Sequence, residues 1–321
     1  MDSNEDRPPL PPAIVLTGPT AAGKTAVAIA LAERFEVDLI SVDSAQVYRG
    51  LDIGSAKLDV AIRRRFPHAL IDVCDPEQSY SAADFVRDCR ACLDKSARSG
   101  RLPVLVGGTM MWLKSLIYGL DPLPSADSDV RRQIIEQAHV RGWAAMHAEL
   151  ARTDSLAAAA ISPNDPQRIQ RALEVVRLTG RGPTHFHRHN RLPRLATLRL
   201  VLTPADRHLL HKRIGKRLEM MLDNGFLDEV STLRRRPGLT LDSASMRSVG
   251  YRQAWQYLDG RFDQQEFFDK AAAATRQLAK RQLTALRQFG GALWYDPDRS
   301  LTIKRVFKQV EQFSRQRGSQ D

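Results

Sequence analysis

The eight-residue segment Gly18–Thr25, with the sequence GPTAAGKT, constrains the fold more than any other feature of the chain. It matches the pattern G-x-x-x-x-G-K-[ST] and lies between an apolar run at 13–17 and a helical pattern at 24–35. In such a loop the glycines let backbone N–H groups point inward, and the helix that follows presents its positive end to an anion. The segment therefore predicts a phosphate site, without distinguishing a nucleoside triphosphate from another diphosphate.

Apolar runs alternate with helical patterns along much of the chain. The strand-like runs lie at 13–17, 37–42, 69–73, 102–106, 195–202 and 292–295, and helical patterns lie at 24–35, 80–98, 110–118, 204–224, 226–235 and 264–289, with a last helix near the C-terminus. Strands that alternate with helices predict a parallel sheet with helices on both faces. The predicted fold class is therefore α/β, a P-loop NTPase-like parallel sheet core flanked by helices.

The middle of the chain interrupts this alternation. Residues 130–179 show helical patterns without a strand, and segments rich in Pro, Gly, Ser and Asp bound them at 121–129 and 180–193. The expected parts of the chain are a disordered leader at 1–12, a core at 13–119 and 194–321, and an all-helical insertion domain at 120–193.

The chain carries an excess of positive charge. Its 321 residues include 48 Lys and Arg against 37 Asp and Glu, a formal net charge of +11. Residues 1–60 hold more acidic than basic side chains, so the excess lies in the rest of the chain. Such an excess favours a polyanionic partner, with nucleic acid as the first interpretation and an anionic membrane surface as the second. A solubilising surface charge is the simplest alternative.

The composition also bears on where the protein works. We expect no transmembrane helix, because no uninterrupted apolar stretch is long enough to cross a bilayer, and we expect nucleic acid rather than a membrane as the partner. Three cysteines are a low, odd count that favours a reducing cytoplasm. A monomer is the default expectation. We interpret the alternating run His185, His187 and His189 as an adventitious feature rather than a metal site.

Several separated motifs resemble one family. They are GPTAAGKT (18–25), SVDSAQVYRGLDIGSAK (41–57), VGGTMMW (106–112), DPQRIQRALEV (165–175), RSVGYRQ (247–253) and LAKRQLTALR (278–287). In order and spacing they resemble the tRNA dimethylallyltransferases, the isopentenyltransferase family that modifies the adenosine beside the anticodon. The resemblance runs from about Ile14 to at least Trp294.

The resemblance implies a reaction and its participants. Dimethylallyl diphosphate would transfer its dimethylallyl group to N6 of an adenosine in the tRNA anticodon stem-loop, and pyrophosphate would leave. The implied cofactor is Mg²⁺, with Thr25 as its protein ligand. The implied diphosphate-binding residues are Gly18, Pro19, Thr20, Ala21, Ala22, Gly23, Lys24, Thr25 and Arg217.

Two residues are the expected catalytic groups. Asp43 matches the family's general base, which would accept the proton of the adenine amine, and its alternative is a helix cap or an Asx turn with Ser44. Thr109 matches a residue whose hydroxyl lies at the reacting ends of the substrates, and its alternative is a helix cap. For Arg217 the alternative is a solvated salt bridge; Arg213 lies four residues away on the same predicted helix face.

The resemblance also implies contacts with tRNA. Residues of the second motif and of the insertion are one group: Asp43, Ser44, Ala45, Gln46, Arg131, Gln167, Arg168, Ile169, Gln170 and Arg171. The other group belongs to the C-terminal part of the core: Arg247, Ser248, Val249, Gly250, Tyr251, Arg252, Lys280, Arg281, Gln282 and Arg287. Tyr251 could equally stack on a base or pack in the interior.

Three other functions fit part of the sequence. A P-loop small-molecule kinase would explain the loop and Lys24 but not the basic surface or the insertion. A non-catalytic tRNA-binding protein would retain RNA affinity after the loss of Asp43. An isopentenyltransferase that acts on free adenine nucleotides would not explain the basic motifs at 247–253 and 278–287, which favour RNA.

Overall fold

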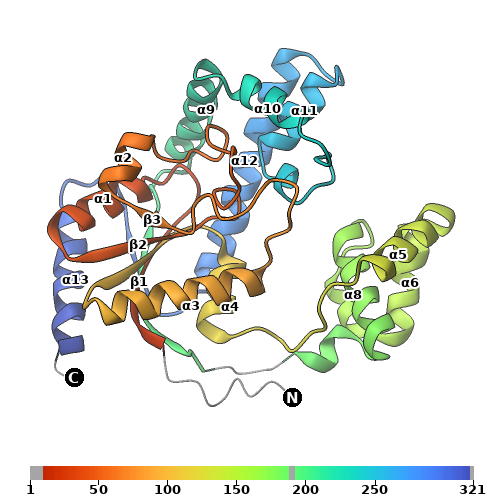
Figure 1. Ribbon diagram of the computed structural model, residues 1–321, viewed down its shortest axis with the longest axis horizontal. Helices are drawn as coiled ribbons and strands as arrows, with labels where there is room; N and C mark the ends of the chain where they lie inside the picture. Colours follow the sequence, from red (N-terminus) through yellow and green to blue (C-terminus); the bar gives the residue numbers. More distant parts are fainter. Residues whose placement is uncertain (1–9, 188–191, 319–321) are drawn as a thin grey trace. The chain divides into compact units, whose positions relative to one another are not determined.

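A computed structural model describes residues 10–187 and 192–318 of the chain (Figure 1). Its contacts divide the chain into two compact units. The core unit comprises residues 1–117 and 193–321, and the insertion unit comprises residues 118–192.

A six-stranded parallel sheet forms the centre of the core unit. Its strands are β1 (Leu10–Thr17), β2 (Val37–Val42), β3 (His68–Ala69), β4 (Leu102–Gly107), β5 (Leu195–Leu202) and β6 (Ala292–Tyr295). Their order across the sheet is β3-β2-β4-β1-β5-β6, and each adjacent pair is parallel. The four central strands consist mostly of buried apolar residues, as expected for a sheet covered on both faces.

Helices cover both faces of this sheet (Figure 1). α1 (Lys24–Arg34) and α13 (Thr302–Gly318) share an apolar cluster with one face, which includes Ile14 and Leu16 of β1. Side chains alternate along a strand, so Val15 points to the opposite face. There α3 (Ala82–Arg98) and α4 (Met110–Tyr118) pack together through stacked rings of Phe85 and Trp112, with centroids 4.6 Å apart.

The C-terminal part of the core unit is helical apart from β6. Its helices are α9 (Arg207–Asp223), α10 (Phe226–Arg234), α11 (Tyr251–Leu258) and α12 (Gln264–Arg287). α9 and α12 pack on each other through Leu210, Ile214 and Ala279, and Ala21 of the GPTAAGKT loop joins this cluster. The loop after β1 is therefore supported by helices that follow it by about two hundred residues in the chain.

The insertion unit contains four α-helices in its described residues. They are α5 (Ser128–Arg141), α6 (Trp143–Thr153), α7 (Ser155–Ala160) and α8 (Pro166–Thr179), followed by a short 3₁₀ helix at Pro183–Phe186. Apolar residues at helical spacing, among them Ile134, Leu150 and Leu173, form a core that belongs to this unit.

The observed elements correct several expectations. The leader predicted at 1–12 is wrong for residues 10–12, because β1 begins at Leu10, which pairs with Leu195; the rest of that prediction, residues 1–9, lies outside the described residues. The strand expected at 69–73 is reduced to His68–Ala69. The short helices α2 (Val60–Arg65) and α11 were not predicted.

No helix among the described residues combines the length and the apolar character needed to cross a membrane.

Candidate active site

Three polar segments meet at one edge of the sheet. The GPTAAGKT loop follows β1, Asp43 follows β2, and Thr109 follows β4. β4 lies between β1 and β2, and all three strands run in the same direction. Since the carboxyl ends of parallel strands lie at a common edge, the order of the strands brings these segments together.

The loop after β1 has the form of a phosphate site. It passes directly into α1, whose N-cap Gly23 has a left-handed conformation and no side-chain cap, so the first N–H groups of the helix stay available. Lys24 Nζ donates to the carbonyl oxygens of Gly18 and Pro19 at 3.0 and 2.8 Å. Position 18 has no room for a side chain, because a Cβ there would lie 2.1 Å from the carbonyl oxygen of Leu202.

Asp43 uses one of its two carboxylate oxygens in a turn. Its Oδ1 accepts hydrogen bonds from the backbone N–H groups of Ala45 and Gln46, at 2.9 and 3.4 Å. Its Oδ2 has no hydrogen-bond partner among residues 10–187 and 192–318. The Asx turn considered from the sequence is therefore present, and it leaves the second oxygen available to accept a proton.

Thr109 links the ends of β2 and β4. Its N–H donates to the carbonyl of Val42 at 3.2 Å, and its Oγ1 accepts the N–H of Ser44 at 3.1 Å. The same hydroxyl lies 3.4 Å from Ser44 Oγ. Thr109 therefore sits beside Asp43 through the intervening Ser44, and its hydroxyl is fixed in this position.

The charges of Lys24, Asp43 and Arg217 influence one another. Burial lowers the pKa of Lys24 to about 8; the carboxylate of Asp43 opposes this shift, and the guanidinium of Arg217 adds to it. Burial also lowers the pKa of Arg217, against the attraction of Asp43. Asp43 is therefore close enough to Lys24 and Arg217 for its charge to affect both cations.

Arg213 and Arg217 differ although both belong to α9. Arg213 forms a salt bridge with Asp298. Arg217 is half-buried and forms no hydrogen bond or salt bridge with any other described residue. A cation withdrawn from water without a counter-charge is unfavourable unless an anion binds beside it. The salt bridge considered as the alternative for Arg217 is therefore not found among the described residues, whereas Arg213 forms one.

Thr25 is the one candidate ligand for Mg²⁺ on the loop, and it is exposed in the first turn of α1. No group of three or more His, Cys, Asp or Glu suited to a metal occurs in the part of the chain that the structure describes. Mg²⁺ usually keeps several waters and binds through few protein oxygens plus substrate phosphates. A single hydroxyl beside a diphosphate site fits that behaviour.

The predicted tRNA residues of the insertion unit separate into two kinds. Gln167 and Arg168 are exposed at the start of α8, whereas Ile169 is fully buried in the core of the unit and cannot present its side chain to RNA. Arg131 and Arg171 both bind the buried carboxylate of Glu174, at 2.9 and 2.6 Å. Gln170 is half-buried.

The predicted tRNA residues of the core unit divide in the same way. Arg247, Arg252, Lys280, Arg281 and Arg287 are exposed, Ser248 and Val249 are partly buried, and Gly250 is buried. Of the two possibilities for Tyr251, the structure shows packing in the interior, because its ring is fully buried edge-on against Phe226. Gln282 points inward to Thr20 and Gly108 rather than outward to RNA.

The segment that carries Ser44, Ala45 and Gln46 is held in place by residues farther along the chain. Gln46 Nε2 donates to the carbonyl of Ser55 at 3.2 Å. The carboxylate of Glu229 accepts the N–H groups of Asp52, Ile53 and Gly54 at 2.9, 2.6 and 3.2 Å, and the hydroxyl of Tyr251 at 2.6 Å. Sequence reasoning missed Glu229, since nothing in its neighbourhood distinguishes it from a solvated helix residue.

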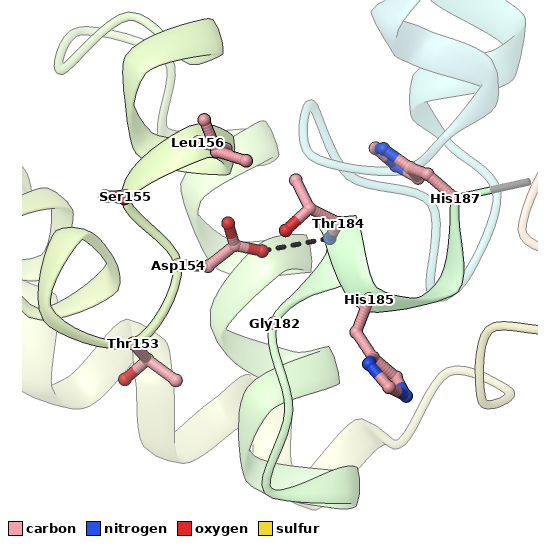
Figure 2. Close-up of a pocket in the computed structure, with 8 residues that line it drawn as sticks. All are labelled: Thr153, Asp154, Ser155, Leu156, Gly182, Thr184, His185 and His187. Carbon is pink, nitrogen blue, oxygen red and sulfur yellow. Dashed lines mark hydrogen bonds between the residues drawn. The ribbon is translucent and has the colours of Figure 1, made fainter. Parts of the chain in front are cut away.

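A separate pocket lies within the insertion unit (Figure 2). Its lining residues are Thr153, Asp154, Ser155, Leu156, Gly182, Thr184, His185 and His187. Both oxygens of Asp154 are occupied by backbone N–H groups, of Ala157 and of Thr184, each at 2.9 Å. The rings of His185 and His187 point in different directions, and His189 lies outside the described residues. The acid therefore joins two turns and offers no free group for chemistry.

The fold and the site define a P-loop-like α/β protein with a loop suited to phosphate near a carboxylate. The sequence matches the model of the IPP transferase family over residues 46–289 and that of the isopentenyl transferases over residues 12–62. The chain belongs to the IPP transferase family.

Close relatives and solved structures agree with this membership. The chain is 48% identical to tRNA dimethylallyltransferase 2 of Hahella chejuensis, over 96% of this chain and 97% of the relative. It is 53% identical to a tRNA dimethylallyltransferase of Stenotrophomonas maltophilia, over 89% and 93%.

Two solved structures share its fold. The tRNA isopentenylpyrophosphate transferase of Bacillus halodurans superposes with a TM-score of 0.70 at 34% identity, over 96% of this chain and 98% of that one. A eukaryotic dimethylallyltransferase described as acting on tRNA gives a TM-score of 0.71 at 25% identity, over 88% and 73%.

Proposed function

We propose that this protein is a tRNA dimethylallyltransferase, which transfers a dimethylallyl group from dimethylallyl diphosphate to N6 of the adenosine next to the anticodon. Pyrophosphate is the second product. The observation that carries the proposal is that two groups influence each other's charge and lack a bonded partner among the described residues. They are the half-buried guanidinium of Arg217 and Oδ2 of Asp43. The guanidinium of Arg217 can stabilise the departing pyrophosphate, and the carboxylate of Asp43 can accept a proton from the incoming amine.

The diphosphate binds to the loop 18–25. The N–H groups at the start of α1, the ammonium of Lys24 and the guanidinium of Arg217 stabilise its oxygens. These cations act most strongly when the C1–O bond breaks, because negative charge then accumulates on the leaving pyrophosphate. Thr25 would hold Mg²⁺, which when bound neutralises part of the same charge.

The adenine amine is a weak nucleophile because its lone pair is delocalised into the ring. As the N6–C1 bond forms, Oδ2 of Asp43 accepts the N6 proton, which contributes about 10²–10⁴-fold to the rate. The hydroxyl of Thr109, fixed by the N–H of Ser44, lies beside this carboxylate and orients the reacting ends.

The base has to leave its stack to reach this edge of the sheet, at a cost of a few kcal/mol. The exposed cations Arg247, Arg252, Lys280, Arg281 and Arg287 are suited to the phosphates of the anticodon stem-loop. In the insertion unit, Gln167 and Arg168 provide a second exposed set. We place the enzyme in the cytoplasm, where tRNA is found, and we propose a monomer, which light scattering would test.

The test is a reconstituted reaction. The protein, Mg²⁺, dimethylallyl diphosphate and an unmodified tRNA with adenosines beside the anticodon are incubated, and the digested RNA is analysed by mass spectrometry. The expected result is a five-carbon gain on that adenosine with release of pyrophosphate. Parallel reactions with free adenosine monophosphate, and with ATP in place of the allylic diphosphate, distinguish the nucleotide-prenylating and kinase alternatives. RNA binding without product would support the non-catalytic alternative.

A further inference from the structure

The amide group of Gln282 joins two segments of the active site that are far apart in the sequence. Its Oε1 accepts the N–H of Thr20 at 2.9 Å, and its Nε2 donates to the carbonyl of Gly108 at 3.0 Å. Thr20 is the third residue of the phosphate loop, and Gly108 directly precedes Thr109. A single side chain on α12 therefore connects the diphosphate cradle to the turn that carries a catalytic hydroxyl.

The amide of Gln282 packs closely against Gly108. A Cβ at position 108 would lie 2.4 Å from Gln282 Nε2 and 3.1 Å from the carbonyl oxygen of Gly18. Gly108 is buried. A side chain at position 108 would therefore push the amide of Gln282 out of its present position and crowd the carbonyl of Gly18.

The phosphate loop also contains a strained residue next to this contact. Ala21 has a φ of 63°, a left-handed conformation that costs a residue with a Cβ about 1 kcal/mol or more. Such a conformation persists only where the surroundings hold it. The side chain of Ala21 packs against the buried cluster of Leu210, Ile214 and Ala279, and the neighbouring Thr20 N–H donates to Gln282.

We propose that Gln282 is a positioning residue, which holds the phosphate loop and the Thr109 turn in a fixed register so that the allylic carbon faces the nucleobase and Asp43. This inference rests on the proposed function and assigns Gln282 a place inside the site, in contrast to the tRNA contact expected from its motif. Lys280 and Arg281, its neighbours on α12, are exposed and remain the candidates for RNA.

The test replaces Gln282 by Met, which keeps the length of the side chain and removes both hydrogen bonds. Gln277→Met, at an exposed position of the same helix, is the matched control. Loss of register by about 1 Å lowers a rate by up to ~10²-fold. We therefore expect Gln282→Met to lower kcat by ~10–100-fold at saturating substrates, to weaken the binding of inorganic pyrophosphate, and to leave tRNA affinity unchanged.

An unchanged kcat, or a loss confined to the KM and Kd for tRNA, would overturn the proposal and return Gln282 to the RNA surface. Gln277→Met should match the wild type in every measurement. If Gln282→Met fails to fold, Gln282→Ala is measured against Gln277→Ala with the same criteria.

The proposed function and the proposed role of Gln282 can be refuted independently of each other. If the wild-type protein makes no prenylated tRNA, the proposed function is wrong, and Gln282 is then judged by the pyrophosphate titration alone. Weaker binding in Gln282→Met would support a role in shaping the loop. Equal binding would overturn it.

Discussion

The backbone N–H of Ser44 donates a 3.1 Å hydrogen bond to the hydroxyl of Thr109. This contact joins the end of β2 to the end of β4, and it places the Thr109 hydroxyl next to the residue that follows Asp43. The residue next to Asp43, the proposed general base, is therefore held by a side chain sixty-five residues farther along the chain.

Thr109→Val should lower kcat by ~10–100-fold, since valine has the shape of threonine without an acceptor for the Ser44 N–H. Thr109→Ser restores the hydroxyl and should recover most of the loss. Steady-state kinetics at saturating tRNA and dimethylallyl diphosphate measures both. Equal rates for the valine and serine variants would show that the hydroxyl has no role.

Asp43→Asn should lower kcat by ~10²–10⁴-fold, because an amide oxygen cannot accept the N6 proton at neutral pH. The same oxygen can still accept the N–H groups of Ala45 and Gln46, so the turn and the tRNA affinity should persist. Single-turnover kinetics and filter binding of tRNA measure the two effects. Full activity in Asp43→Asn would remove this residue from the chemistry.

Arg217→Gln should raise the Kd for pyrophosphate by ~10–100-fold, equivalent to ~1.5–3 kcal/mol for a hydrogen bond to a charged group. Arg213→Gln is the control from the same helix, and it breaks only a partly exposed pair with Asp298, worth about 0–1 kcal/mol. Titration calorimetry with pyrophosphate and Mg²⁺ compares the two. Similar losses in both variants would indicate a general effect of positive charge.

Activity should fall on the alkaline side as Lys24 loses its proton. Its pKa in the free protein is about 8, below the ordinary value, because burial disfavours the charged form. The cation is therefore present below that pH and lost as the pH rises through it. A bound diphosphate favours the charged form and raises the pKa.

We therefore expect kcat/KM for dimethylallyl diphosphate to decline above a pH of about 8, whereas kcat declines only at a higher pH. Initial rates at low diphosphate report kcat/KM, and initial rates at saturating diphosphate report kcat. Both are measured across the alkaline range. A kcat/KM that stays constant through this range would contradict the assignment.

Glu174→Ala should destabilise the insertion unit. Burial opposes ionisation of Glu174, but hydrogen bonds from Arg171, the N–H of Asp127 and Arg131 outweigh it and lower its pKa. Removal of the carboxylate leaves both guanidiniums without their partner. The cost is about 2–3 kcal/mol, reduced from that of a fully buried pair because both arginines are partly exposed.

Hydrogen exchange in α5 and α8 should accelerate in Glu174→Ala, with no change in the strands of the core unit. Glu136→Ala, at an exposed position of α5, provides the control. Unchanged protection in α8 would show that the two ion pairs do not support the unit.

The sequence predicted the elements whose residues have a local signal. The strands predicted at 37–42, 195–202 and 292–295 have the same bounds in the structure, and the phosphate loop lies between β1 and α1 as predicted. These predictions succeed because glycine spacing and apolar runs can be recognised within a short stretch of sequence. The inward orientation of Gln282 and the burial of Tyr251 depend on contacts with residues far away in the chain. A motif shows which residues occur together, and packing decides which of them face the solvent.

The two oxygens of Asp43 have a consequence for the end of each catalytic cycle. The amides of Ala45 and Gln46 hold Oδ1 and so oppose rotation of the carboxyl group about its Cβ–Cγ bond. In the proposed reaction, Oδ2 would therefore keep its orientation after it takes the N6 proton. It would release that proton on the side from which the base entered.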